Sequence, residues 1–262
     1  MDLLYPRCAG LDVHATTVVA CARIATGGTV TYERLTVSTS TRGLLQLADW
    51  LAAKGVTHAA MEATGVYWKP VWHVLEGSCA LILAHAQHIR NIPGRKSDKN
   101  DAAWIADLLA LGLIRGSLVP PAAIQELRDL TRTRKQLVRE IARHTQRVQK
   151  ILEDANVKLT EAISDVLGAT GRAILQALID GETDPQRLAD LTKGRLKASR
   201  GQLVEVLHGR VAAHHRFMLR LHLTHIEAIE QAVTDLEAHL EETLAPFRAA
   251  ISLLITMPGL ST

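Results

Sequence analysis

The sequence predicts a mixed α/β domain followed by an all-helical region. All four tryptophans and all three tyrosines lie before residue 105, and the later part holds only Phe217 and Phe247 as aromatic residues. Runs rich in β-branched residues fill the first part, whereas long apolar patterns with 3/4 spacing occupy the second. We therefore expect a globular domain over residues 1–117 and helical structure over 118–247.

Three strands open the first domain as an antiparallel meander. β-branched residues are frequent at 7–14, 17–25 and 29–37, which is the composition of strands. Gly27-Gly28 separates the second run from the third, and two glycines at that position are typical of a hairpin turn. The first three strands are therefore predicted to be neighbours in one sheet.

Helices and strands alternate after the meander. An amphipathic helix follows the N-capping residues at 38–41 and ends at Gly55, and a second helix is predicted at 66–75. A strand follows each helix, at 56–61 and at 79–84. With one more helix near residue 100, the order is βββαβαβα. This order favours a mixed sheet covered by helices, as in RNase H-like folds.

Four acidic residues stand at the ends of these elements. Asp12 lies in the first apolar strand, Glu62 follows the fourth strand, and Asp98 and Asp101 open a helix three residues apart. An ionised carboxylate inside a buried strand is costly unless it has a partner. Carboxylates from separate elements can hold two divalent cations about 4 Å apart at a phosphodiester. The pattern favours Mg²⁺- or Mn²⁺-dependent phosphodiester chemistry, although each acid alone is more often structural and Asp98 could cap its helix.

Two apolar seams beyond Pro120-Pro121 predict long coiled-coil helices. The first seam runs over residues 127–151 and is interrupted by Arg134 and His144, and the second runs over 219–247 with acidic residues on its flanks. Glycines between the two seams break the chain into short helices. We expect an antiparallel helical excursion whose tip the sequence does not define.

A stripe of basic residues follows the first long helix at intervals of three and four. Only Asp129 and Glu140 offset its charge, whereas a solvated coiled-coil face usually interleaves both signs. We predict contact with a nucleic-acid backbone, and pairing with the acidic flanks of the second helix is the alternative. The basic stripe comprises Arg128, Arg132, Lys135, Arg139, Arg143, Arg147 and Lys150, and Arg95 and Lys96 add positive charge beside the acids.

Three short motifs contain the four acids, namely Gly-Leu-Asp-Val-His at 10–14, Met-Glu-Ala-Thr-Gly at 61–65 and Lys-Ser-Asp-Lys-Asn-Asp-Ala at 96–102. Together they resemble the signature of DEDD transposases, the IS one-ten family of bacterial insertion sequences. The three motifs occur in this order and at suitable separations. The resemblance covers residues 8–160 well and the later helical region weakly.

The resemblance implies a RuvC-like domain in which Asp12, Glu62, Asp98 and Asp101 are the catalytic, metal-binding acids. It implies recombination of donor and target DNA guided by a structured RNA of the element. It also implies that the proteins assemble as dimers or tetramers through the coiled coil. These implications agree with the chemistry that the four acids favour by themselves.

One feature departs from the family pattern. Family members continue into a C-terminal domain with a serine nucleophile, and that domain opens with a Pro-Gly motif like Met-Pro-Gly-Leu at 257–260. The chain stops at Thr262, and neither Ser252 nor Ser261 matches the position of the nucleophile. We therefore expect residues 248–262 to begin a truncated domain, and the chain to be inactive in strand exchange by itself.

Two rival functions stay open. One is a stand-alone RuvC-like nuclease that is metal-dependent and structure-specific, and the other is a non-catalytic nucleic-acid-binding dimerisation module. No apolar run reaches the roughly 20 residues that span a bilayer, so we expect no membrane partner and a location in the bacterial cytoplasm. Three cysteines are expected to be buried reduced thiols, and six histidines at 208–239 to be ordinary surface or seam residues.

Overall fold

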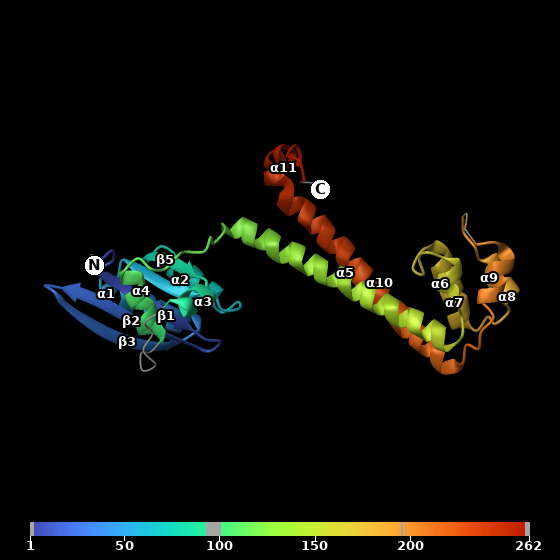
Figure 1. Ribbon diagram of the computed structural model, residues 1–262, viewed down its shortest axis with the longest axis horizontal. Helices are drawn as coiled ribbons and strands as arrows, with labels where there is room; N and C mark the ends of the chain where they lie inside the picture. The colour runs from blue at the N-terminus through green and yellow to red at the C-terminus, as the bar shows by residue number, and fades with distance from the viewer. Residues whose placement is uncertain (1–2, 93–100, 195, 197, 260–262) are drawn as a thin grey trace. The chain divides into compact units, whose positions relative to one another are not determined.

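The computed structural model of the protein describes residues 3–92, 101–194, 196 and 198–259 (Figure 1). The chain divides into two compact units, Met1–Val119 and Pro120–Thr262. Each unit has a hydrophobic core of its own, and each is described by itself below.

The first unit is built on one mixed five-stranded sheet with the strand order β3-β2-β1-β4-β5. β1, β2 and β3 pair antiparallel, as the predicted meander requires, whereas β4 pairs parallel with both β1 and β5. Gly27 and Gly28 have positive φ angles of 58° and 84°, so the hairpin between β2 and β3 has the predicted turn. The strands are β1 (Arg7–Val13), β2 (Thr17–Thr26), β3 (Thr29–Ser38), β4 (His58–Glu62) and β5 (Ala80–Ala84).

Helices cover both faces of this sheet. On one face, Leu44 of α1 and Val71 of α2 pack in a core that includes Leu11 of β1. On the other face, Trp104 of α4 packs in a cluster with Cys8 of β1. The arrangement fits the predicted α/β RNase H-like domain. The helices are α1 (Thr41–Ala53), α2 (Trp68–Leu75), α3 (Ala86–Asn91) and α4 (Asp101–Ala110).

Two long antiparallel helices are the longest elements of the second unit (Figure 1). Short helices lie between them in the chain, and a 3₁₀ turn and one more helix follow them. No helix in the described part of the chain is both long enough and apolar enough to cross a membrane. The helices are α5 (Ala122–Asp154), α6 (Leu159–Ala162), α7 (Ala169–Asp180), α8 (Pro185–Asp190), α9 (Arg200–Val206), α10 (Ala213–Leu244), η1 (Ala245–Phe247) and α11 (Arg248–Ile255).

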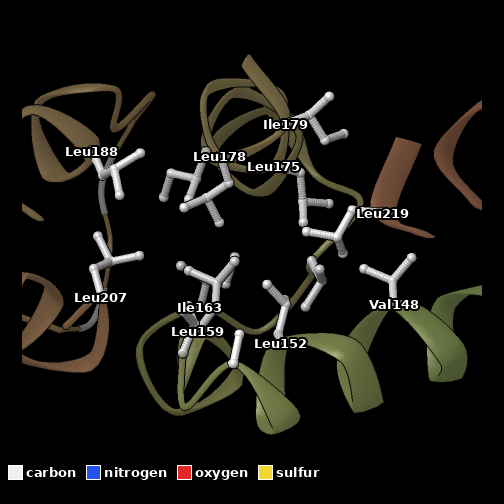
Figure 2. Packing of buried hydrophobic residues seen from close by; sticks show 14 of the residues in the cluster. Val148, Leu152, Leu159, Ile163, Leu175, Leu178, Ile179, Leu188, Leu207 and Leu219 are labelled. Carbon is white, nitrogen blue, oxygen red and sulfur yellow. The ribbon is translucent and has the colours of Figure 1, made fainter. Parts of the chain in front are cut away.

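The core of the second unit lies where α6–α9 meet the adjoining ends of α5 and α10 (Figure 2). Val148 and Leu152 of α5 face Leu175 of α7 and Leu219 of α10 there, and all four side chains are buried. Farther along the pair, Leu137 of α5 is only half-buried. The short helices thus form a cap around one end of the helical pair, and coiled-coil packing along the rest stays a prediction.

Polar residues cross the seam of the helical pair. Arg134, which interrupts the predicted seam, forms an ion pair with Glu237 of α10, with its Nη2 2.6 Å from Oε1. Nδ1 of His144 lies 3.1 Å from Nδ1 of His222, and the ring of His225 stacks on that of His144 with centroids 5.4 Å apart. The polar interruptions of the two seams therefore meet partners on the opposite helix.

The hydrogen bonds of His144 fix its neutral tautomer. Arg147 donates from Nη1 to Nε2 of His144 over 3.5 Å, so the Nδ1 proton of His144 is the one that faces His222. Burial lowers the pKa of His144 and of His222, and the nearby Arg147 and His225 lower both further, while Glu140 opposes the shift at His144. Both imidazoles are therefore held neutral near pH 7.

We expect the second unit to lose stability on mild acidification. Because the pKa of each of these histidines is lower in the folded chain, the unfolded chain binds more protons once the pH falls below the ordinary value of 6.5. The free energy of unfolding, measured by urea titration, should be lower at about pH 5 than at about pH 7.5. A variant with His144→Gln and His222→Gln should show a smaller difference, whereas His239→Gln, at an exposed position, should behave like the parent. Equal differences in all three proteins would contradict the assignment.

Candidate active site

Asp12 and Glu62 lie at the carboxyl ends of two adjacent parallel strands. Leu11 of β1 is in register with Met61 of β4, so the two acids are the next residues on their strands. Neighbouring strands run about 4.8 Å apart, and side chains in equivalent register leave the same face of a sheet. Both carboxylates therefore project at one sheet edge, on the face that α4 covers.

α4 brings Asp101 to the same edge. The last residue of α4, Ala110, accepts a hydrogen bond from the backbone N–H of Leu4 at 2.9 Å, just before β1. One turn earlier, the carbonyl of Ala106 lies 3.5 Å from Sγ of Cys8 on β1. The helix thus runs antiparallel to β1, and its first residue, Asp101, lies toward the end of the strand that carries Asp12.

Gly10 lets α4 lie directly on β1. A Cβ atom at this position would lie 2.0 Å from the carbonyl oxygen of Ala102 and 2.6 Å from the backbone nitrogen of Ala106. Only a residue without a side chain fits between strand and helix at that separation. The glycine of the Gly-Leu-Asp-Val-His motif therefore sets the distance between α4 and the strand that carries Asp12.

The three acids differ in exposure. The side chain of Asp12 is 26% exposed, and its Oδ2 lies 3.2 Å from Nε2 of His14. Glu62 is half-buried and Asp101 is exposed, so a ligand at this edge can reach carboxylate oxygens. Asp98, Arg95 and Lys96, which were also predicted for this site, lie outside the described residues.

A polar cluster anchors the far half of α4, and sequence reasoning missed it. Nε of Arg23 on β2 donates to Oδ1 of Asp107 over 3.1 Å, and the hydroxyl of Tyr32 on β3 donates to the same oxygen over 2.5 Å. Burial and the hydrogen bond to Asp107 raise the pKa of Tyr32. The sequence feature that could have indicated this cluster is Arg23, a charged residue within the apolar run at 17–25. This cluster fixes the position of the helix that begins with Asp101.

The model of the IS110-type DEDD transposase family, described as "Transposase", matches residues 9–157. This match includes more than half of the chain. The chain belongs to this family. A search of curated proteins found no match. Family membership makes DNA the partner of this transposase, and places it among enzymes that cut and recombine DNA and generally depend on divalent metal ions.

The basic stripe of the transposase is exposed along α5. All seven of its residues are exposed. Within the described contacts, none of the seven forms an ion pair with an acid of α10, and it is the seam residue Arg134 that pairs with Glu237. The acidic flanks of α10 therefore do not pair with the stripe in the described part of the structure.

One further group of metal-ligand residues lies where α5 ends and α10 begins. Within the described part of the chain, ligand atoms of Asp154, His214 and His215 lie within 4.8 Å of one another. Nδ1 of His215 accepts the backbone N–H of Ala212 over 3.1 Å, so Nε2 carries the proton and donates to Oδ2 of Asp154 over 2.8 Å. In this tautomer Nε2 has no lone pair for a metal ion. We interpret the group as a structural link between the two helix ends.

Proposed function

We propose that the chain takes part in metal-dependent cleavage and exchange of DNA strands in the movement of a bacterial insertion sequence. The supporting observation is the strand register that puts Asp12 and Glu62 side by side, together with the direction of α4, which carries Asp101. We include Asp98 in the acid set on the family resemblance alone. No other edge of the sheet offers such a group of carboxylates among the described residues.

The donor set suits Mg²⁺ or Mn²⁺. Asp12, Glu62 and Asp101 offer only carboxylate oxygens, which are the ligands that hard divalent cations prefer. When bound, such ions would neutralise the charge that builds up on the phosphodiester oxygens. The chain's own residues would hold the ions and orient the strand, and His14, in contact with Oδ2 of Asp12, would orient that carboxylate.

Substitution of Asp12 by Asn tests the acid site. The change keeps the size of the side chain and removes its charge, so we expect Mn²⁺ affinity, measured by titration calorimetry, to fall at least about tenfold. Asp49→Asn is the matched control, because Asp49 is an exposed acid of α1 in the same unit. Equal Mn²⁺ affinity in Asp12→Asn and the parent would refute the assignment.

We further propose that the basic stripe contacts a nucleic-acid backbone, in the first place a structured guide RNA. A row of exposed cations without partners on α10 suits phosphate groups and carries little sequence information. Assembly into dimers or tetramers would use the half-buried apolar seam of α5 and α10, including Leu137, in a coiled coil.

A salt titration tests the stripe. Changing Arg132, Lys135, Arg139 and Arg143 to Gln removes four cations, so the slope of log affinity against log salt should become shallower by about 3. The control changes Arg187 and Arg200 to Gln, since these pair with Glu182 and Asp190 in the same unit. An unchanged slope in the fourfold variant would show that the stripe is only a solvated face.

A further inference from the structure

Two exposed apolar side chains follow Glu62 at the acid-bearing edge. The turn at residues 63–67 leads from the end of β4 into α2, so it lies at the edge where Glu62 ends its strand. Val66 is 64% exposed and Tyr67 is 45% exposed. Single exposed apolar residues are common, but this pair follows Glu62 by four and five residues, at the sheet edge that carries the proposed catalytic acids.

The Tyr67 ring lies close to the turn. Gly65 has a φ of 56°, and a Cβ added there would lie at van der Waals distance, 3.7 Å, from Cε2 of Tyr67. The backbone N–H of Thr64 donates to the carbonyl of Glu62 over 2.9 Å, which ties the turn to the strand. The ring thus lies near a defined turn, and much of Tyr67 faces solvent.

The fold explains the other two tyrosines but not Tyr67. The ring of Tyr5 packs on His58 with centroids 3.9 Å apart, and the hydroxyl of Tyr32 donates to Asp107. In the described part of the structure, the hydroxyl of Tyr67 has no hydrogen-bond partner and its ring packs on no other ring. An exposed aromatic ring without a role in the core is suited to stacking on a ligand.

We propose that Tyr67 is a stacking platform for an unpaired nucleobase of the DNA strand whose phosphate lies at Asp12 and Glu62. This inference rests on the proposed function, because the acids determine where the strand runs. Every base has a π-face, so stacking on an aromatic side chain tolerates any sequence. Val66 would cover the edge of the same base. The platform would hold one nucleotide unstacked from its neighbours next to the bond to be cut.

Binding of a short single-stranded DNA with one 2-aminopurine base tests the platform on the full chain with Mg²⁺ present. Tyr67→Ala should weaken binding, measured by fluorescence anisotropy, about tenfold, and should reduce the quenching of 2-aminopurine on binding. Tyr67→Phe keeps the π-face and should match the parent in both measurements. Leu45→Ala is the control, since Leu45 is another exposed apolar residue of this unit.

The outcomes separate this inference from the function on which it rests. If the parent binds the DNA and Tyr67→Ala binds it within about twofold with the same quenching, the platform is refuted and the acid site stands. If the parent does not bind the DNA, and Mn²⁺ affinity does not depend on Asp12, both proposals are refuted. A loss in Tyr67→Ala that Tyr67→Phe restores supports the platform, because a merely structural tyrosine at an exposed position would leave the quenching unchanged.

Discussion

Gly10→Ala is expected to lower the free energy of unfolding of the first unit by about 3 kcal/mol or more. The added methyl group would lie 2.0 Å from the carbonyl oxygen of Ala102 and 2.9 Å from Cβ of Ile105. Two of its three nearest atoms belong to the backbone of α4, which cannot rotate away as a flexible side chain could. The helix must therefore shift away from β1, and Asp101 would shift with it.

Urea unfolding of the variant provides the measurement, and Mn²⁺ titration of the folded fraction reports on the acids. Gly116→Ala is the matched control in the same unit, because a Cβ there would meet only Cγ2 of Ile82 at an ordinary 3.5 Å. That control should stay within about 1 kcal/mol of the parent. A Gly10→Ala protein as stable as Gly116→Ala would show that α4 does not lie on β1 at this separation.

Local sequence patterns predicted much of the first unit. β-branched runs and Gly27-Gly28 predicted the meander, and strands at 56–61 and 79–84 correspond to β4 and β5. Such patterns are local, since a strand or a hairpin turn depends on residues that are close in sequence. The same patterns placed Asp12 near the end of the first predicted strand and Glu62 directly after the fourth.

Contacts between distant segments could not be predicted in this way. Arg23 and Asp107 are 84 residues apart, and their contact depends on the axial position of α4 over the sheet. His144 and His222 were predicted only as polar interruptions of two separate seams, because one sequence does not determine how two long helices are aligned. The arrangement of the short helices around the end of the pair could not be predicted for the same reason, since their burial depends on packing between distant segments and not on periodicity.

Asp107→Ala should destabilise the first unit by about 3–5 kcal/mol. Arg23 is only 8% exposed, and Asp107 is the acid with which it forms its ion pair. Nη1 of Arg23 is already buried without a hydrogen-bond partner in the described structure. Removing the carboxylate would leave a buried guanidinium without its counter-charge, and would also leave the Tyr32 hydroxyl without its acceptor.

A double variant separates the effect of the missing partner from that of the lost packing. Replacing both residues, with Arg23→Met and Asp107→Leu, removes the charge together with its partner, so most of the stability should return. Asp107→Asn keeps an acceptor for both donors and should fall between the parent and Asp107→Ala. If the double variant is as unstable as Asp107→Ala alone, the damage is a packing defect. The polar cluster of Arg23, Tyr32 and Asp107 would then hold α4, and with it Asp101, through packing and not through charge.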